Sequence, residues 1–163
     1  MKGIAFLSGL ISGLLTSGIV LPVVAQVTSD GTTSTTVNST GNNFNILNGI
    51  QKGNNLFHSF GEFSIPTGSS VNFNNSTDVV NIINRVTGGN ISNIDGLIKA
   101  NGNANLFLIN HAGIVFGENA KLDIGGSFLR STAESILFED GFNYSVIDSQ
   151  QTPLLTVSVP LGL

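Results

Sequence analysis

Short apolar clusters separated by asparagine, glycine, serine and threonine dominate this 163-residue sequence from Phe44 onward. No segment keeps apolar residues at helical spacing across three turns with helix-forming residues between them. Brief apolar runs bounded by turn-forming residues are typical of β-strands joined by tight bends. The sequence therefore predicts an all-β domain.

The spacing of the clusters indicates how the strands are arranged. Their centres lie six to ten residues apart, at 97–98, 106–109, 114–116, 122–124 and 128–129. Three strands with their corners then need about 22–25 residues, which is one circuit of a parallel β-helix. Asparagine suits such corners, because it tolerates left-handed backbone and its side chains can hydrogen-bond from coil to coil. An antiparallel sandwich has similar spacing and stays open, although no Asn-Gly or Asp-Gly hairpin clearly joins two long alternating runs.

The first 25 residues have the organisation of a secretory signal peptide. Lys2 precedes an apolar run over residues 4–24, and small residues stand before a cleavage site that we predict directly after Ala25. A permanent membrane anchor is the alternative, since the run is nearly long enough to span a bilayer. The threonine-rich residues 26–43 are predicted to form an N-terminal extended arm or a first edge strand.

Charge and cysteine content exclude several classes of protein. Six basic residues stand against ten acidic ones, for a net charge of −4, which disfavours a nucleic-acid partner. Charged residues make up only 10% of the chain, so its surface depends on amides and hydroxyls. The absence of cysteine excludes disulfides, thiolate metal sites and cysteine nucleophiles.

The remaining polar residues form no catalytic or metal-binding motif. His58 and His111 have neither a second histidine nor a suitably spaced carboxylate nearby, so both are expected at the surface or in turns. Among the carboxylates, Glu139 and Asp140 are adjacent, but neighbours in a strand point to opposite faces. We therefore predict no catalytic residues, no metal and no cofactor. A carbohydrate-active β-helix enzyme, with carboxylates converging in a groove, is kept as an alternative function.

Arg85 is a charge within an apolar and β-branched stretch, residues 82–88. It is either an exposed strand residue or a buried guanidinium satisfied by corner carbonyls, and the sequence does not separate the two.

The two ends of a β-helix need cover. The aromatic-rich segment 56–66, which contains Phe57, Phe60 and Phe63, is expected to cap the N-terminal end. Residues 153–160 alternate like a final strand but bring no evident polar cap. We therefore expect residues beyond 163, or another surface, to cover that face.

Four ordered blocks, at residues 53–60, 84–96, 103–117 and 120–128, resemble the N-terminal secretion domain of filamentous haemagglutinin-like exoproteins, in the form seen in cyanobacterial members. The resemblance spans roughly Gly41 to Ala133. The family's Asn-Pro-Asn-Gly-Ile box stands here as residues 110–114, with His111 and Ala112 in place of proline and asparagine. Replacing proline frees φ, and replacing asparagine removes a turn-favouring side chain.

The resemblance implies a right-handed parallel β-helix with an N-terminal β cap, formed by residues 44–163 as the secretion domain. It also implies two-partner secretion, in which the periplasmic POTRA domains of an outer-membrane β-barrel transporter capture the chain and the exoprotein leaves through the barrel. Folding outside the cell would then favour export. The residues expected to serve partner recognition and folding are Asn54, Asn55, Leu56, Arg85, Asn105, Leu106, Asn110, Gly113 and Ile114.

The leading interpretation is a non-enzymatic secretion and adhesion module. It predicts a protein that passes the periplasm of a Gram-negative cell to the medium or cell surface, binds a host or cell-surface ligand, and has neither a nucleic-acid partner nor stable membrane insertion. Besides the enzyme, a self-assembling structural module whose bare C-terminal face stacks on another copy is a further alternative.

Overall fold

The structure is a computed structural model that describes residues 26–150 and 160–162, and within those residues every regular element is a strand. The predicted signal peptide, residues 1–25, lies outside the described residues. Of the predicted final strand, only Pro160 is described, where β16 (Pro160–Gly162) begins.

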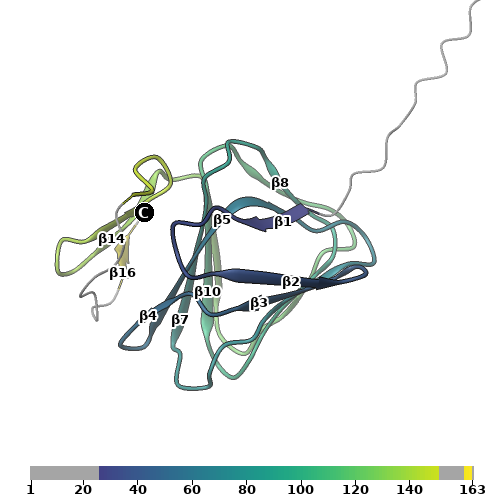
Figure 1. The fold of residues 1–163 in the computed structure, drawn as a ribbon, viewed down its shortest axis with the longest axis horizontal. Coiled ribbons are helices and arrows are strands. Elements are labelled where there is room, and N and C mark those ends of the chain that lie inside the picture. The colour runs from purple at the N-terminus through teal and green to yellow at the C-terminus, as the bar shows by residue number, and fades with distance from the viewer. Residues whose placement is uncertain (1–25, 151–159, 163) are drawn as a thin grey trace, which may run out of the picture.

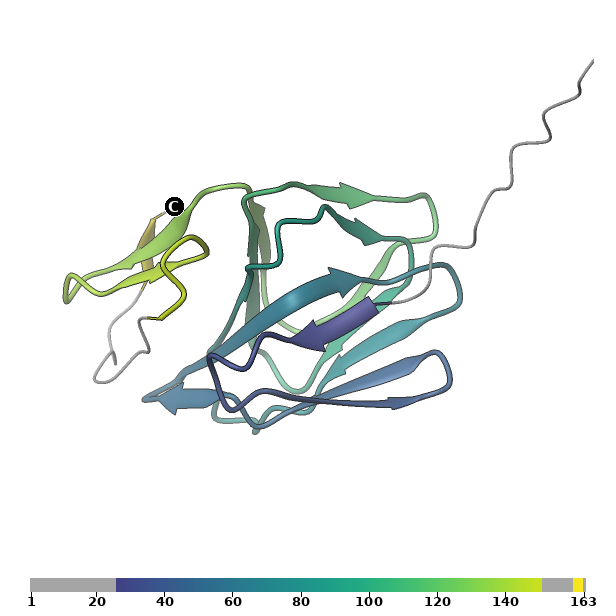
Figure 2. The same ribbon diagram turned by 45° about the horizontal axis from the view of Figure 1, so that its top comes forward.

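The chain winds through three strand positions per coil, and each strand pairs in parallel with its counterpart one coil later (Figures 1 and 2). One face consists of β5 (Asn55–Ser64), β7 (Asn81–Val86), β10 (Asn105–Asn110) and β13 (Phe128–Ser131). The second consists of β3 (Asn43–Leu47), β6 (Ser70–Phe73), β9 (Leu97–Ala100) and β12 (Lys121–Asp123). The third is short and consists of β8 (Ser92–Ile94) and β11 (Ile114–Phe116).

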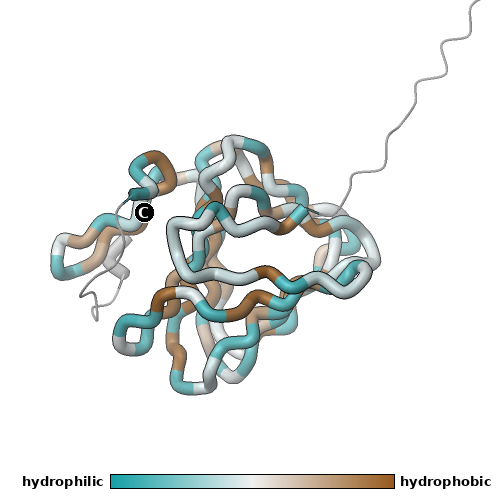
Figure 3. Tube along the Cα trace, viewed as in Figure 1, coloured by the Kyte–Doolittle hydropathy of each residue, from teal (hydrophilic) through white to brown (hydrophobic). Residues whose placement is uncertain are grey.

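These strands make about four coils of a parallel β-helix. The predicted fold class is confirmed, and the antiparallel sandwich is wrong. Hydrophobic stretches of the trace are brief and are interrupted by hydrophilic ones (Figure 3), as the short apolar clusters of the sequence require.

Asparagine side chains join successive coils at the start of the first face. Asn81 Nδ2 donates to Asn55 Oδ1 at 2.8 Å, across 26 residues of chain, and Asn105 Nδ2 donates to Asn81 Oδ1 at 3.0 Å, across 24 residues. The backbone N–H of Ser127 donates to Asn105 Oδ1 at 2.9 Å and carries the ladder into the fourth coil. The expected coil-to-coil bonding of asparagine is therefore present, although the first coils are slightly longer than the spacing predicted.

The interior is filled by alternate residues of each strand. Leu56, Ile82 and Leu106 occupy equivalent positions in three coils, and all are buried in the main hydrophobic cluster. Phe60 and Phe63 both lie in this cluster although they are three residues apart, because β5 shifts register against β1 (Gln26–Ser29) between them.

The outward side of the first face is also buried. Phe57, Ile83 and Ile109 point outward, opposite to the interior residues, and pack against the C-terminal hairpin of β14 (Ser135–Phe138) and β15 (Asn143–Ser145). Figure 1 shows this hairpin beside the coil. An Asp-Gly turn at 140–141 joins the two strands, with Gly141 at a φ of 83°, so an antiparallel hairpin does occur as an appendage to the parallel coil.

Antiparallel strands cap the N-terminal coil, but they are not the ones expected. β1 and β4 (Ile50–Lys52) pair with the free edge of β5, and β2 (Thr36–Thr40) pairs with the free edge of β3. The aromatic segment 56–66 itself lies within the first coil. The expectation that this segment is the cap is therefore wrong, because in β5 it pairs in parallel with β7.

His58 lies in the interior, which corrects the expectation of a surface or turn position, whereas His111 is exposed in a turn. The His58 ring packs near Phe60 and Phe73, and its Nδ1 lies 2.9 Å from Thr35 Oγ1 of the N-terminal cap. Burial lowers the pKa of His58 to about 3, so the imidazole is neutral in the folded protein.

Replacing Asn81 by alanine tests the asparagine ladder. The variant loses the bond that Asn81 donates and the one that it accepts, so we expect the free energy of unfolding to fall by about 2 kcal/mol in urea titrations. Asn93→Ala is the control, because the side chain of Asn93 is exposed. Equal stability of the two variants would contradict a structural role for the ladder.

The buried His58 predicts acid sensitivity. Its pKa is about 3 when folded and near its ordinary 6.5 when unfolded, so the unfolded state binds the extra proton as the pH falls below 6.5. Between about pH 7.5 and about pH 5 we expect a loss of about 2 kcal/mol of stability from this group. Urea titrations of His58→Gln at both pH values should lack this component; an unchanged pH dependence would contradict it.

Candidate recognition and folding site

The predicted residues at the start of the first face belong to the coil-to-coil contacts. Asn55 and Asn105 are both in the asparagine ladder, and Leu56 and Leu106 are buried below it in the interior. Asn54 is exposed, and its carbonyl accepts bonds from the backbone N–H groups of the next coil at 2.8 and 3.1 Å. Two sequence blocks about two coils apart thus meet in one ladder.

Asn110 ties together the corner that follows β10. Its Oδ1 accepts the N–H of Ala112 at 3.0 Å, and its Nδ2 donates to the Asn90 carbonyl and to Ser92 Oγ, both at 2.9 Å. The side chain is buried and thereby satisfies polar groups of two coils at once.

Gly113 and Ile114 complete this corner. Gly113 has a φ of 126°, a conformation that side-chain-bearing residues rarely adopt, and its carbonyl accepts the N–H of Ser92 at 3.0 Å. Ile114 opens β11 and is buried, in register with Ser92. The three residues of the box that match the family pattern therefore hold the corner in its fold.

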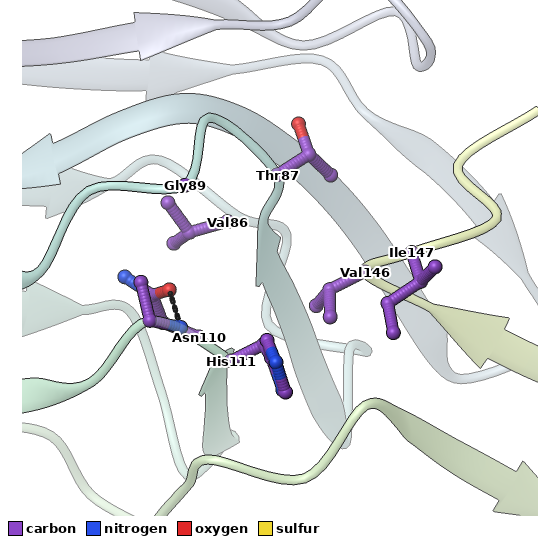
Figure 4. Close-up of a pocket in the computed structure, with 8 residues that line it drawn as sticks. Val86, Thr87, Gly89, Asn110, His111, Val146 and Ile147 are labelled. Carbon is purple, nitrogen blue, oxygen red and sulfur yellow. Dashed lines mark hydrogen bonds between the residues drawn. The ribbon is translucent and has the colours of Figure 1, made fainter.

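The two residues of the box that differ from the family pattern lie at the surface. His111 is exposed and Ala112 is half-buried. Both line a cavity of about 450 Å³ whose other side includes Val146 and Ile147 of the C-terminal segment (Figure 4). The replacements therefore change a surface cavity and leave the contacts between coils in place.

Arg85 is fully buried on the outward side of β7, where the C-terminal hairpin covers it. Its Nε donates to Ser59 Oγ at 2.8 Å, and its terminal nitrogens donate to the carbonyls of Ser145 and Ser149 at 2.8 and 2.6 Å and to Thr32 Oγ1 at 3.0 Å. The carbonyl partners belong to the C-terminal segment and not to corners of the coil. One side chain thus joins the N-terminal arm, the first two coils and the C-terminal segment.

Hydroxyl groups link the guanidinium to a carboxylate. Ser59 Oγ donates to Asp30 Oδ2 at 2.6 Å, and Thr32 Oγ1 donates to Asp30 Oδ1 at 2.8 Å, so each bridges Asp30 to Arg85. Burial alone would raise the pKa of Asp30, but the hydrogen bonds from Ser59, Thr32 and Thr87 outweigh it and lower the pKa. The buried positive charge of Arg85 is therefore balanced by the Asp30 carboxylate through the bridging hydroxyls of Ser59 and Thr32.

Tyr144 packs over the same guanidinium. The Arg85 Cζ lies 4.2 Å from the centre of the Tyr144 ring, and the Tyr144 hydroxyl donates to the His58 carbonyl at 2.9 Å. Burial raises the pKa of Tyr144, which keeps the phenol protonated. Sequence reasoning did not single out Tyr144 or Asp30. The available signal was Arg85 itself, since a charge on a β-branched strand requires partners from elsewhere.

The predicted residues thus form two groups at opposite ends of the strands of the first face, and the structure does not bring them together at a reacting centre. In the part of the chain that the structure describes, no three histidine or acidic side chains come close enough to hold a metal ion. Glu139 and Asp140 lie exposed in the turn between β14 and β15.

The model of the TPS secretion domain matches residues 25–163, which include the whole described β-helix and its C-terminal hairpin. The chain belongs to the TPS secretion domain family. A comparison with curated proteins finds no match. The TPS domain is a secretion module, which makes this chain the N-terminal domain of a two-partner secreted exoprotein.

The described part of the TPS domain contains no helix long and apolar enough to cross a membrane.

Replacing Arg85 by leucine tests how the segments of the TPS domain are held together. The variant leaves the carbonyls of Ser145 and Ser149 without their donor, so we expect a loss of about 3 kcal/mol in unfolding experiments. Amide hydrogen exchange should rise most in β14 and β15.

Lys99→Ala is the matched control, because this cation forms an exposed ion pair with Asp123 and its removal should change stability by less than about 1 kcal/mol. Unchanged exchange in β14 and β15 of Arg85→Leu would rule out the joining role.

Proposed function

We propose that this TPS domain is the export signal read by an outer-membrane β-barrel transporter with periplasmic POTRA domains. The observation that carries the proposal is the family match over residues 25–163, which covers the fold and both groups of predicted residues. The signal peptide over residues 1–25, cleaved after Ala25, would deliver the chain to the periplasm of a Gram-negative cell, and the transporter would release it to the medium or the cell surface.

The burial of the motif residues bears on when recognition happens. Eight of the nine predicted residues are buried or half-buried, and only Asn54 is exposed, so in the folded domain their side chains offer little to a partner. The POTRA domains would therefore meet these residues in the extended chain, before the coils form. After export the same residues hold the fold.

Folding of the coils outside the cell would make export of the chain one-way. Each strand finds its parallel partner 22–27 residues away, so a coil closes as soon as the next one has emerged. Burial of the apolar strands outside the membrane then opposes backward movement of the chain. Completion requires residues 145–149, because Arg85 lacks carbonyl partners until they arrive.

The exported protein would be an adhesin-type exoprotein. It would bind a host or cell-surface ligand and catalyse no reaction. Support comes from the resemblance of four blocks to haemagglutinin-like exoproteins. The carbohydrate-active alternative requires carboxylates that converge in a groove. Asp30 is engaged by hydroxyls, and Asp95 by Thr67 and Asn119, so these two carboxylates serve the fold. Asp123 forms an exposed ion pair with Lys99. The acidic balance of the chain likewise argues against a nucleic-acid partner.

Export can be tested by co-expressing the chain with a candidate POTRA-containing outer-membrane transporter and assaying the medium. We expect release only when the transporter is present with its POTRA domains intact. Asn110→Ala should reduce release several-fold, because it removes three bonds at the corner. Asn93→Ala is the control and should be released normally. Equal release with and without the transporter would overturn the proposal.

A further inference from the structure

The last described coil ends in strand edges that pair with no other described strand. Among the described strands, β13 pairs only with β10 and β12 only with β9, so one edge of each has no strand beside it. Phe116, Leu122 and Phe128 line a cavity of about 360 Å³ at this end, and Leu122 is 46% exposed. Unpaired edges around an apolar opening are a template for association with another chain.

Arg130 occupies an interior position at this end. It is in register with Leu108, which is fully buried in the main hydrophobic cluster, so the strand directs the Arg130 side chain inward. Each of the preceding coils has its own inward residue at this register: His58, Asn84 and Leu108. The fourth coil alone has a permanent charge there.

Contacts hold the Arg130 side chain across the opening. Its Cζ lies 5.3 Å from the centre of the Phe116 ring, and a terminal nitrogen donates to the Ile114 carbonyl at 3.3 Å. Phe116 in turn meets Phe128 edge-on at 5.8 Å between ring centres. The aliphatic stem can thus shield apolar surface while the guanidinium stays in water, since Arg130 is exposed.

We propose that Arg130 guards the open C-terminal end of the coil against stacking on a second copy of this chain. Two copies that met end to end would bury both guanidinium groups between two apolar interiors, with like charges facing each other across a two-fold axis. Charges that point inward are one way in which β-proteins protect an exposed edge. The other charges of this edge, Lys121 and Asp123, flank Leu122 and point outward, where stacking would leave them in water.

Arg130→Leu should create the association that the wild-type chain avoids. We expect sedimentation equilibrium to show a monomeric wild-type protein and a variant that dimerises at least about tenfold more tightly. Lys121→Leu is the matched control, since it adds the same side chain to the same edge on its outward side. Arg130→Lys keeps the charge and should stay monomeric.

Hydrogen exchange at increasing protein concentration locates the contact. In Arg130→Leu, protection should appear in β12 and β13. A folded Arg130→Leu variant that remains monomeric overturns the proposal, as does equal dimerisation of Lys121→Leu. If Arg130→Leu does not fold, the wild-type protein decides: protection of its β12 and β13 that rises with concentration would show that Arg130 does not guard this end.

Discussion

Parallel pairing in register between successive coils fixes the direction of every side chain in this molecule. Leu56 must lie over Ile82, and Ile82 over Leu106, for the interior to be apolar. A shift of one residue would turn these side chains outward and bring the outward-facing residues inside. The asparagines at 55, 81 and 105 mark the correct register, because their amides bond only when the strands start level. Differences in coil length are absorbed in the corners, where they leave the register unchanged.

Both sides of the first face are buried, one by the interior of the coil and the other by the C-terminal hairpin. Arg85, on the outward side, therefore needs hydrogen-bond partners within the protein. Once the C-terminal hairpin covers Phe57 and Ile83, the neighbouring outward position is also removed from water. A buried guanidinium is costly unless its donors are satisfied. Four hydrogen bonds and the face of Tyr144 satisfy it here, and they come from segments more than 100 residues apart in sequence, Thr32 and Ser145 among them. The same contacts thereby fix the position of the hairpin on the coil.

The sequence was sufficient for an all-β fold, since the length of apolar clusters and the nature of corner residues are local properties. The asparagine ladder was foreseeable for the same reason. The spacing favoured a β-helix but left the sandwich open, and the resemblance of the four blocks implied the β-helix. The sequence alone does not show which residues are buried by segments far away along the chain. His58 is buried because Thr35 of the N-terminal cap lies over it, and Arg85 is buried because Ser145 and Ser149 return to it. The aromatic segment was assigned to the cap because its phenylalanines indicate that it is buried. They do not indicate that it pairs in parallel with β7. The two groups of site residues were named individually, but their separation along the strands emerged only from the register.

The hydrogen bonds that Arg85 donates to Thr32, Ser145 and Ser149 have a mechanical consequence. Because they join the arm at Thr32 to the segment at Ser149, tension applied between those two regions would load these few polar contacts before the stacked strands. A few contacts then carry the whole load, whereas each stacked strand shares its load among many backbone hydrogen bonds and apolar contacts. When the chain is pulled from both ends, the hydrogen bonds of Arg85 would therefore break first. The β-helix would remain folded at that force.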